Sequence, residues 1–341
     1  MARKARSTEL IIILGLLVFL KEYIKLSINM ATEDHTMIKK VSIIIPNFNG
    51  KDILGKNLPV VLKACEKFGL HQTEIIVVDD ASSDESVSFV EKNFPQIKLV
   101  IHQVNQFFAA TCNTGVSLAK GQIVVLLNSD VVPEVDFLPP LVNHFNNEET
   151  FSVGCREVDC RNGKEILSGK GIMMFKRGLV VHRRAPEQDA GITSWTSAGS
   201  AAYSREKWEK LGGLDTLFRP AYEEDRDLSY RASKHGWVNL YEPKSVVHHH
   251  HETTNQKVFG NRKIEIYSFK NQFLFVWKNI TDSKYLLSHL VWLPYHLTLT
   301  NFRTDGRLLQ GFILALKQLP EVLKSRRSVK KFFVKKDCEL I

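Results

Sequence analysis

One uninterrupted apolar stretch, residues 121–130 with the sequence GQIVVLLNSD, constrains the fold of this chain more than any other feature. An apolar run without alternation is typical of a strand buried on both faces, as in a parallel sheet covered by helices. Asp130 ends this run, at the edge where open α/β sheets bind their ligands. Asp130 is therefore a candidate for binding a metal or a phosphate, although an Asp that caps the next turn fits the same spacing.

A regular alternation of strands and helices precedes this stretch. The apolar β-branched runs are residues 41–45, 74–78 and 97–101, and helical segments separate them. This rhythm predicts an α/β fold whose parallel sheet has right-handed crossovers. Asp79 and Asp80 end the second run, so two strands bring carboxylates to one sheet edge. Ser82 or Ser83 is expected to cap the helix that follows.

A second acidic cluster, residues 223–227 with the sequence EEDRD, opens a helix expected to reach about His235. Acidic residues are favoured in the first turn of a helix, and Asp227 and Arg231 have the i,i+4 spacing of an ordinary surface pair. Three consecutive acidic residues beside Tyr222 nevertheless exceed what capping requires. One of these carboxylates is therefore a candidate general base.

Two further stretches suggest binding sites. Residues 195–200, WTSAGS, are mostly small, as expected of a surface that a ligand approaches closely. Four consecutive histidines, residues 248–251, follow a short apolar run. Single histidines are usually structural, but alternation along a strand sends two of these four to each face. A neutral imidazole binds divalent transition metals well, whereas magnesium prefers oxygen ligands.

Both ends of the chain suggest a membrane. Residues 10–20 are apolar and flanked by basic residues, but the run is short for a spanning helix. A short membrane anchor is expected there rather than a cleaved signal, unless translation starts at Met30 or Met37. From Lys257 onward, 16 Lys and Arg residues face 6 Asp and Glu residues. Such a basic segment is expected to bind a polyanion, either nucleic acid or an anionic membrane surface.

The C-terminal segment is apolar-rich but broken by Pro294, Gly306 and Pro320. Two arrangements fit it, and they are compatible: helices that lie in a membrane interface, or a helical subdomain packed on the core. No nucleic-acid-binding module with interleaved aromatic and basic residues is recognisable, so nucleic acid is not an expected partner. The five cysteines are scattered and odd in number, which favours a reducing compartment.

Taken in order, these motifs resemble those of glycosyltransferase family 2, and especially its rhamnosyltransferase-like branch. The matching stretches are VSIIIPNFN (41–49), VVDDASSD (77–84), NTG through AKG (113–121), LNSD (127–130), GGLD (212–215), EDRDL (224–228) and PKSVVHH (243–249). The resemblance implies a GT-A fold: Rossmann-like, with a mostly parallel sheet, helices on both faces and a C-terminal helical, membrane-associated extension. It divides the chain into an N-terminal segment (1–36), a GT-A domain (41–255) and a basic amphipathic tail (256–341).

The resemblance also implies roles for individual residues. Binding of the donor would fall to Pro46, Asn49, Asp79, Asn113, Asn128 and Asp130. Asp130 and His249 would hold a divalent cation, Mg²⁺ or Mn²⁺, with His248 and His250 as alternatives to His249. Asp225, next to Glu224, matches the catalytic base of the family. The residues expected on the acceptor side are Trp195 and Gly199.

Two departures from the family pattern bear on the donor loops. Asn128 replaces the first Asp of the Asp-x-Asp motif, so metal binding there would rest mainly on Asp130. Where relatives often have Asn-x-Gly-Phe, residues 105–108 read NQFF, which puts Phe107 in the place of the glycine. The geometry of that loop is therefore an open question for the structure.

The activity implied by the resemblance is inverting, metal-dependent transfer of a sugar. The donor would be a UDP- or dTDP-sugar, with dTDP-rhamnose as one candidate. The acceptor would be a hydroxyl of a glycan or glycolipid, lipid-linked or part of a cell-surface polysaccharide. The enzyme would work at the cytoplasmic face of the membrane. The alternative is a non-catalytic protein that binds nucleotide sugars or scaffolds a polysaccharide synthesis complex.

Overall fold

The computed structural model describes residues 39–161, 164–249 and 254–341. Lys40–Ile341 make up one unit, to which the following description applies. The first part of this unit alternates strands and helices as the sequence predicts. Its elements are β1 (Val41–Asn47), α2 (Lys51–Phe68), β2 (Thr73–Asp79), α3 (Ser86–Asn93), β3 (Lys98–Ile101), α4 (Phe107–Ser117) and β4 (Ile123–Leu127). The pairings β4 with β1, β1 with β2 and β2 with β3 are all parallel.

The second part of the unit extends the same sheet. Its elements are β5 (Val131–Pro133), α5 (Leu138–Asn143), β6 (Thr150–Arg161), β7 (Lys164–Ser168), β8 (Gly171–Lys176), β9 (Leu179–Arg184), β10 (Gly191–Ile192), β11 (Ser200–Ser204), α6 (Arg205–Leu211), α7 (Glu224–Lys234) and β12 (Val238–His249). The strand order is β10-β12-β6-β11-β4-β1-β2-β3. Because β11 runs antiparallel to both β4 and β6, the whole sheet is mixed.

β6 and β7 pair antiparallel, with Arg161 opposite Lys164. A separate two-stranded sheet is formed by β8 and β9. Short 3₁₀ helices lie at Leu70–Gln72, His144–Asn146, Thr216–Phe218 and Asp337–Glu339.

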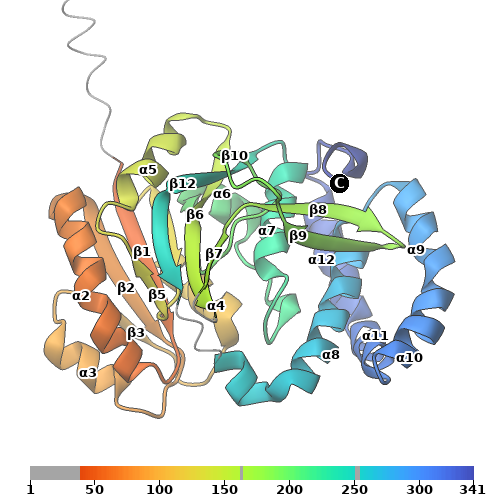
Figure 1. Ribbon diagram of the computed structural model, residues 1–341, viewed down its shortest axis with the longest axis horizontal. Helices are drawn as coiled ribbons and strands as arrows, with labels where there is room; N and C mark the ends of the chain where they lie inside the picture. Colours follow the sequence, from red (N-terminus) through yellow and green to blue (C-terminus); the bar gives the residue numbers. More distant parts are fainter. Residues whose placement is uncertain (1–38, 162–163, 250–253) are drawn as a thin grey trace, which may run out of the picture. The chain divides into compact units, whose positions relative to one another are not determined.

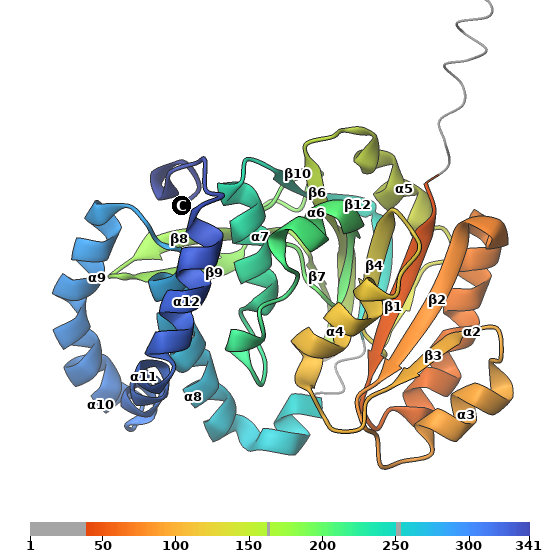
Figure 2. The ribbon, with the colours of Figure 1, turned by 180° about the vertical axis from the view of Figure 1, so that it is seen from behind.

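Helices cover both faces of the central sheet (Figures 1 and 2). Successive residues of a strand point to opposite faces. Ile43 and Val125 therefore join the core under α2, α3 and α5. Ile44 and Val124 join a second core, which contains residues of α4, α6 and α7. Burial on both faces explains why β1 and β4 are apolar without alternation.

A group of helices follows β12. Its members are α8 (Thr254–Asn279), α9 (Ser283–Tyr295), a π-helical turn (His296–Thr300), α10 (Asn301–Arg303), α11 (Arg307–Lys317) and α12 (Leu319–Lys330). In Figure 1 α9, α10 and α11 lie past the ends of β8 and β9, on the side of the unit opposite α2 and α3. α8 is kinked at Gly260, whose backbone is not helical. The boundary predicted at residue 255 falls at the beginning of this helix.

The C-terminal helices share a third core with the rest of the unit. Phe273 and Phe275 of α8 pack in one cluster with Met173 of β8, Leu179 of β9 and Tyr230 of α7. The expectation of a helical subdomain packed on the core is therefore confirmed. Within the part of the chain that the structure describes, no helix has both the length and the apolar character needed to cross a bilayer. The segment expected to be an anchor, residues 10–20, lies outside the described residues.

Candidate active site

The carboxyl ends of β1 and β2 are joined by side-chain hydrogen bonds. Asn47 Nδ2 donates to Asp79 Oδ2 at 2.8 Å, and Ser82 donates to the same carboxylate from its backbone N at 2.9 Å and from Oγ at 2.6 Å. Pro46 is buried in β1 opposite Val78. The carboxylate of Asp79 is thus fixed in the loop that follows its own strand.

The prediction that Ser82 or Ser83 caps the next helix is wrong. α3 begins at Ser86, and Asp84 Oδ1 accepts a hydrogen bond from the backbone N of Ser86 at 3.0 Å. Ser82 bonds Asp79 instead, and the backbone N of Ser83 donates to Asn49 Oδ1 at 2.7 Å. Both serines therefore form hydrogen bonds at the edge of the sheet, and these bonds connect the loop after β1 with the loop after β2.

A cavity of about 380 Å³ lies beside these two loops. It is lined by Asn49, Gly50, Lys51, Asp52, Ile53, Asp84 and Glu85. Its volume falls in the range of about 300–1,000 Å³ that is typical of small-molecule sites. The predicted donor residue Asn49 therefore borders a space that can hold a ligand of modest size.

Asp80, the neighbour of Asp79, orders the loop in which Phe107 replaces glycine. Its carboxylate accepts hydrogen bonds from His102 Nδ1 at 2.7 Å and from the backbone N of Gln106 and Phe107 at 2.8 and 2.9 Å. Phe107 has φ of 67°, a left-handed conformation that glycine adopts freely and other residues adopt at a cost of about 1–2 kcal/mol. The loop thus keeps a backbone suited to glycine although it carries a phenylalanine.

The loop after β4 contacts the small-residue stretch. Asn128 donates from its backbone N to the carbonyl O of Gly199 at 2.9 Å. A Cβ atom on Gly199 would come within 2.6 Å of Asn128 Nδ2. The lack of a side chain at Gly199 therefore lets the Asn128 side chain pack against it. The sequence suggested instead the close approach of a ligand.

Asp130 lies against one of the histidines. Its Oδ2 is 3.4 Å from Nε2 of His249, and both side chains are mostly buried. Burial favours the neutral imidazole, but the hydrogen bond and charge of Asp130 outweigh it and raise the pKa of His249. His248 pairs with Glu134 instead, at 2.8 Å, and residues 250 and 251 lie outside the described part. The structure thus brings Asp130 together with His249.

The acidic cluster lies at the beginning of α7, as the sequence predicts. Glu224 is buried, and Asp225 keeps part of its surface exposed. Asp225 accepts a hydrogen bond from the backbone N–H of Arg226 at 2.8 Å, and the polar backbone of Ala198 lies near the same carboxylate. Ala198 precedes Gly199, so two consecutive residues connect the carboxylate of Asp225 with the loop that carries Asn128 and Asp130.

Burial changes the proton affinity of these carboxyl groups. Burial, together with the negative charge of Asp225, raises the pKa of Glu224 to about 8. Burial also raises the pKa of Asp225, against the opposing charge of Arg226. At neutral pH Glu224 therefore retains its proton.

Lys270 of α8 belongs to the same site and was not found from the sequence. It is buried, and its Nζ donates to the carbonyl O of Arg219. Burial lowers the pKa of Lys270 to about 8, although the nearby charge of Glu224 acts to raise it. Polar residues at positions 268, 271 and 272 surround Lys270 in the sequence, so no pattern marked it as buried.

Trp195 lies beside the acidic cluster. Its ring faces the guanidinium of Arg226, with the central carbon 5.7 Å from the ring centroid, and Arg226 also pairs with Glu223. His182 also packs against Trp195, with ring centroids 5.6 Å apart. The predicted acceptor-side residue is thus connected to α7 through a cation–π contact.

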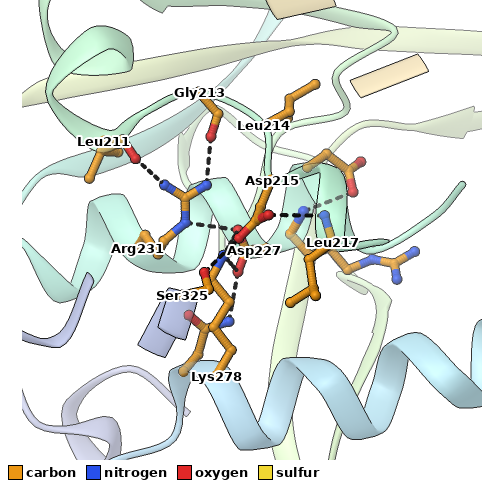
Figure 3. Close-up of polar contacts among 12 residues, drawn as sticks. Leu211, Gly213, Leu214, Asp215, Leu217, Asp227, Arg231, Lys278 and Ser325 are labelled. Atoms are coloured by element: carbon orange, nitrogen blue, oxygen red, sulfur yellow. Dashed lines mark hydrogen bonds and ion pairs between the residues drawn. The ribbon is translucent and has the colours of Figure 1, made fainter. Parts of the chain in front are cut away.

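A buried ion network holds α7 in place (Figure 3). The carboxylate of Asp227 accepts hydrogen bonds from Arg231 Nε, Lys278 Nζ and Asn279 Nδ2, each at 2.8 Å. Lys278 also pairs with Asp215 at 2.7 Å. Asp227 and Arg231 are at most 2% exposed, so the interpretation of this pair as an ordinary surface pair is wrong.

The predicted donor residue Asn113 supports the same region. Its Nδ2 donates to the carbonyl O of Leu214 at 2.8 Å, and its Oδ1 accepts from the backbone N of Leu214 at 3.0 Å. Arg231 donates to the carbonyl O of Gly213 at 2.7 Å. Asn113 therefore stabilises the turn between α6 and α7 through two hydrogen bonds to the backbone of Leu214.

The family model for "Glycosyl transferase family 2" matches residues 42–212, which is half of the chain and contains β1 to α6. This chain belongs to glycosyl transferase family 2. The described site lies at the sheet edge of the matched region, and α7 adds Glu224 and Asp225 from beyond its end.

Relatives within and around this family cover different parts of the chain. The O-antigen chain rhamnosyltransferase RfbN of Salmonella typhimurium is 23% identical over 64% of this chain and 69% of its own length. An undecaprenyl-phosphate 4-deoxy-4-formamido-L-arabinose transferase of Edwardsiella ictaluri is 31% identical over 32% of this chain, a match that spans only 34% of that protein.

Solved structures agree on the fold of this family 2 member. The crystal structure of GalNAc-T7 with UDP, GalNAc and Mn²⁺ superposes on 84% of this chain and 58% of that one, with a TM-score of 0.61 at 18% identity. A likeness at this identity concerns the fold alone. The expected GT-A fold with an additional C-terminal helical region is confirmed.

The raised pKa of Glu224 makes the stability of this family 2 member depend on pH. A carboxyl group that binds its proton more tightly in the folded state stabilises the fold most below its unfolded pKa of about 4.3, and this stabilisation is lost as pH rises toward 8. We expect the Glu224→Gln variant to match the wild type near pH 5 and to exceed its free energy of unfolding at pH 9. Urea denaturation at both pH values measures this difference.

The matched control is Glu91→Gln, which changes an exposed glutamate of α3. It should show no such trend. An equal difference between Glu224→Gln and the wild type at pH 5 and pH 9 would contradict the assignment of a high pKa to Glu224.

Proposed function

We propose that this family 2 member transfers a sugar from a nucleoside-diphosphate donor to a hydroxyl of a lipid-linked or cell-surface polysaccharide acceptor, with inversion at the anomeric carbon. The observation that carries the proposal is the connection between two loops. The carboxylate of Asp225 lies near the backbone of Ala198, and the adjacent Gly199 packs on Asn128. A candidate base and the loop of the candidate metal ligand Asp130 are therefore held together by neighbouring backbone groups.

Asp130 and His249 fit a divalent cation, Mg²⁺ or Mn²⁺. A carboxylate and an imidazole 3.4 Å apart offer one oxygen and one nitrogen ligand. Within the described ranges, no group of three or more His, Cys, Asp or Glu side chains could hold a metal. Oxygens of the donor diphosphate would have to complete the coordination. When bound, such a cation supplies positive charge that neutralises the departing nucleoside diphosphate.

Asp225 acts as the base in this proposal. A carboxylate that has kept its negative charge can take the proton from the acceptor hydroxyl while this oxygen attacks the anomeric carbon. Glu224, protonated at neutral pH, adds no second negative charge beside Asp225. Attack from the face opposite the leaving group needs one base and inverts the configuration, in contrast to the two carboxylates of a glycosidase.

The donor and acceptor sides follow from the surroundings of this base. The cavity beside Asn49 borders the loop that follows β2, in which Ser82 bonds Asp79, and a UDP- or dTDP-sugar is the proposed donor. The similarity to RfbN supports dTDP-rhamnose as the first donor to test. Trp195, beside Arg226 at the beginning of α7, offers an aromatic face on the acceptor side. Pro46 and Asn113 support these loops from within the protein.

An anionic membrane surface is the proposed location of the enzyme. Leu287, Leu290, Val291 and Phe302 are exposed, Phe302 at 86%, and their spacing puts them along one side of α9 and α10. Basic residues dominate this part of the chain, and helices of this character lie in membrane interfaces. Buried free thiols at Cys65, Cys112 and Cys155 support a reducing compartment, hence the cytoplasmic face.

Turnover of a donor panel tests the transfer itself. With Mg²⁺ or Mn²⁺ and a bacterial membrane lipid fraction as acceptor, we expect the wild type to consume one nucleotide sugar. Asp225→Asn should lower the rate by about 10²–10⁴-fold because the base is lost. The control Asp136→Asn changes an exposed carboxylate and should retain full activity.

The outcome also decides between the enzyme and the scaffold. Equal turnover by Asp225→Asn and the wild type would contradict the base assignment. Tight binding of a nucleotide sugar without turnover of any donor, in the presence of the lipid acceptor, would favour the non-catalytic alternative.

Co-sedimentation with vesicles tests the membrane proposal. Leu290→Glu places a charge on the apolar side of α9, at a residue that is 63% exposed, and should lower binding to phosphatidylglycerol vesicles about tenfold. Leu70→Glu is the matched control, since Leu70 is 60% exposed but lies in the short helix after α2. Equal binding by Leu290→Glu and the wild type would remove α9 from the membrane contact.

A further inference from the structure

A second cavity, of about 330 Å³, lies between α8 and α11. It is lined by Lys263, Ile266 and Tyr267 of α8 and by Gln310, Ile313 and Leu314 of α11. Most of this lining is apolar, and the polar groups come from the two exposed residues Lys263 and Gln310. No residue that lines this cavity has a role in the proposed transfer reaction.

The cavity exists because α8 and α11 meet closely at one point and diverge beside it. A Cβ atom on Gly311 would come within 2.7 Å of the Ile266 carbonyl O and within 2.8 Å of the backbone N of Lys270. The glycine therefore lets the helices touch at this crossing. Gln310, Ile313 and Leu314 flank the crossing on α11 and line the space next to it.

The rim of the cavity carries one cation without a carboxylate partner among the described residues. Arg262 pairs with Asp305 at 2.9 Å, and Arg307 pairs with Glu265. These two pairs neutralise the arginines near the rim. Lys263 is the remaining cation, so the rim favours an anionic ligand whose other end is apolar.

The cavity is connected to the candidate active site through α8. Tyr267 lines the cavity, and Lys270 Nζ lies 5.8 Å from the centroid of its ring. Lys270 in turn lies close enough to Glu224 of the acidic cluster for the two groups to influence each other electrostatically. The apolar cavity with its cationic rim thus lies about one turn of α8 away from Lys270, the residue near Glu224.

We propose that this cavity binds a segment of the isoprenoid chain of the lipid-linked acceptor, with its phosphate near Lys263. The inference rests on the proposed function, because it takes the acceptor to be a lipid. A volume of about 330 Å³ is near the lower limit of small-molecule sites, so it accommodates part of a single chain better than the paired chains of a phospholipid. Leu309, Ile313 and Leu316 are exposed along one side of α11, so the cavity opens on an apolar surface.

Calorimetric titration of the full-length protein with farnesyl phosphate tests this site without any transfer reaction. Ile313→Asp introduces a charge into the lining, and we expect the dissociation constant to rise at least about tenfold. Leu316→Asp is the matched control: the two residues are 45% and 44% exposed on the same helix, but Leu316 is not part of the lining. Leu316→Asp should bind farnesyl phosphate as the wild type does.

Butyl phosphate separates the chain from the phosphate. It should bind the wild type at least about tenfold more weakly than farnesyl phosphate, because the chain supplies most of the affinity. Equal binding of both ligands, or equal binding of farnesyl phosphate by Ile313→Asp and the wild type, would overturn the proposal. A wild type that is dimeric by light scattering, with Ile313→Asp monomeric, would instead assign the cavity to a second copy of the chain.

The activity assay keeps the two proposals apart. If transfer to the lipid fraction fails for every donor while farnesyl phosphate binds in the cavity, only the transfer reaction is refuted. If transfer proceeds and Ile313→Asp leaves the KM for the lipid acceptor unchanged, only the chain site is refuted.

Discussion

The arrangement of this protein depends on one buried carboxylate, that of Asp227. Three donors from two helices, Arg231 of α7 and Lys278 and Asn279 of α8, surround it where no solvent reaches. Removing such a charge from its partners costs several kcal/mol, since each partner would be left buried and uncompensated. The network therefore fixes the beginning of α7 against α8 and, through the Arg231 bond to Gly213, against the turn after α6.

This constraint has a direct consequence for the chemistry. Asp225 lies two residues from Asp227, so the helix turn that is fixed by the network also carries the candidate base. The carboxylate then reaches Ala198, while Gly199 accommodates Asn128. Elements from both ends of the matched family region and from the C-terminal helices thus meet at one sheet edge. The C-terminal helices contribute Lys270 to this site, and the second cavity lies along the same helix, α8.

The sequence predicted those features that depend on local pattern. Unbroken apolar runs marked β1 and β4, and the order of motifs indicated the family. Features that depend on distant partners were missed or misread. The i,i+4 spacing of Asp227 and Arg231 is the same for a surface pair and a buried one, and only the arrival of Lys278 from α8 separates them.

Other misreadings have the same origin. Ser82 has the spacing of a helix cap, but its Oγ bonds Asp79 and also accepts a hydrogen bond from the backbone N of Asn49 in the loop after β1. Phe107 keeps a left-handed backbone because Asp80 holds it by hydrogen bonds. Propensity and spacing carry no information on such contacts, which form only when the chain has folded.

A double-mutant cycle on Asp227 and Lys278 tests the central claim most directly. The free energies of unfolding of Asp227→Asn, Lys278→Met and the double variant would be measured by urea denaturation. If the buried pair organises the site, each single change leaves an unpaired buried group and costs about 3–5 kcal/mol. The double variant should then cost at least about 1 kcal/mol less than the sum of the two. Additivity within about 0.5 kcal/mol would mean that the two groups do not depend on each other, and the account would be wrong.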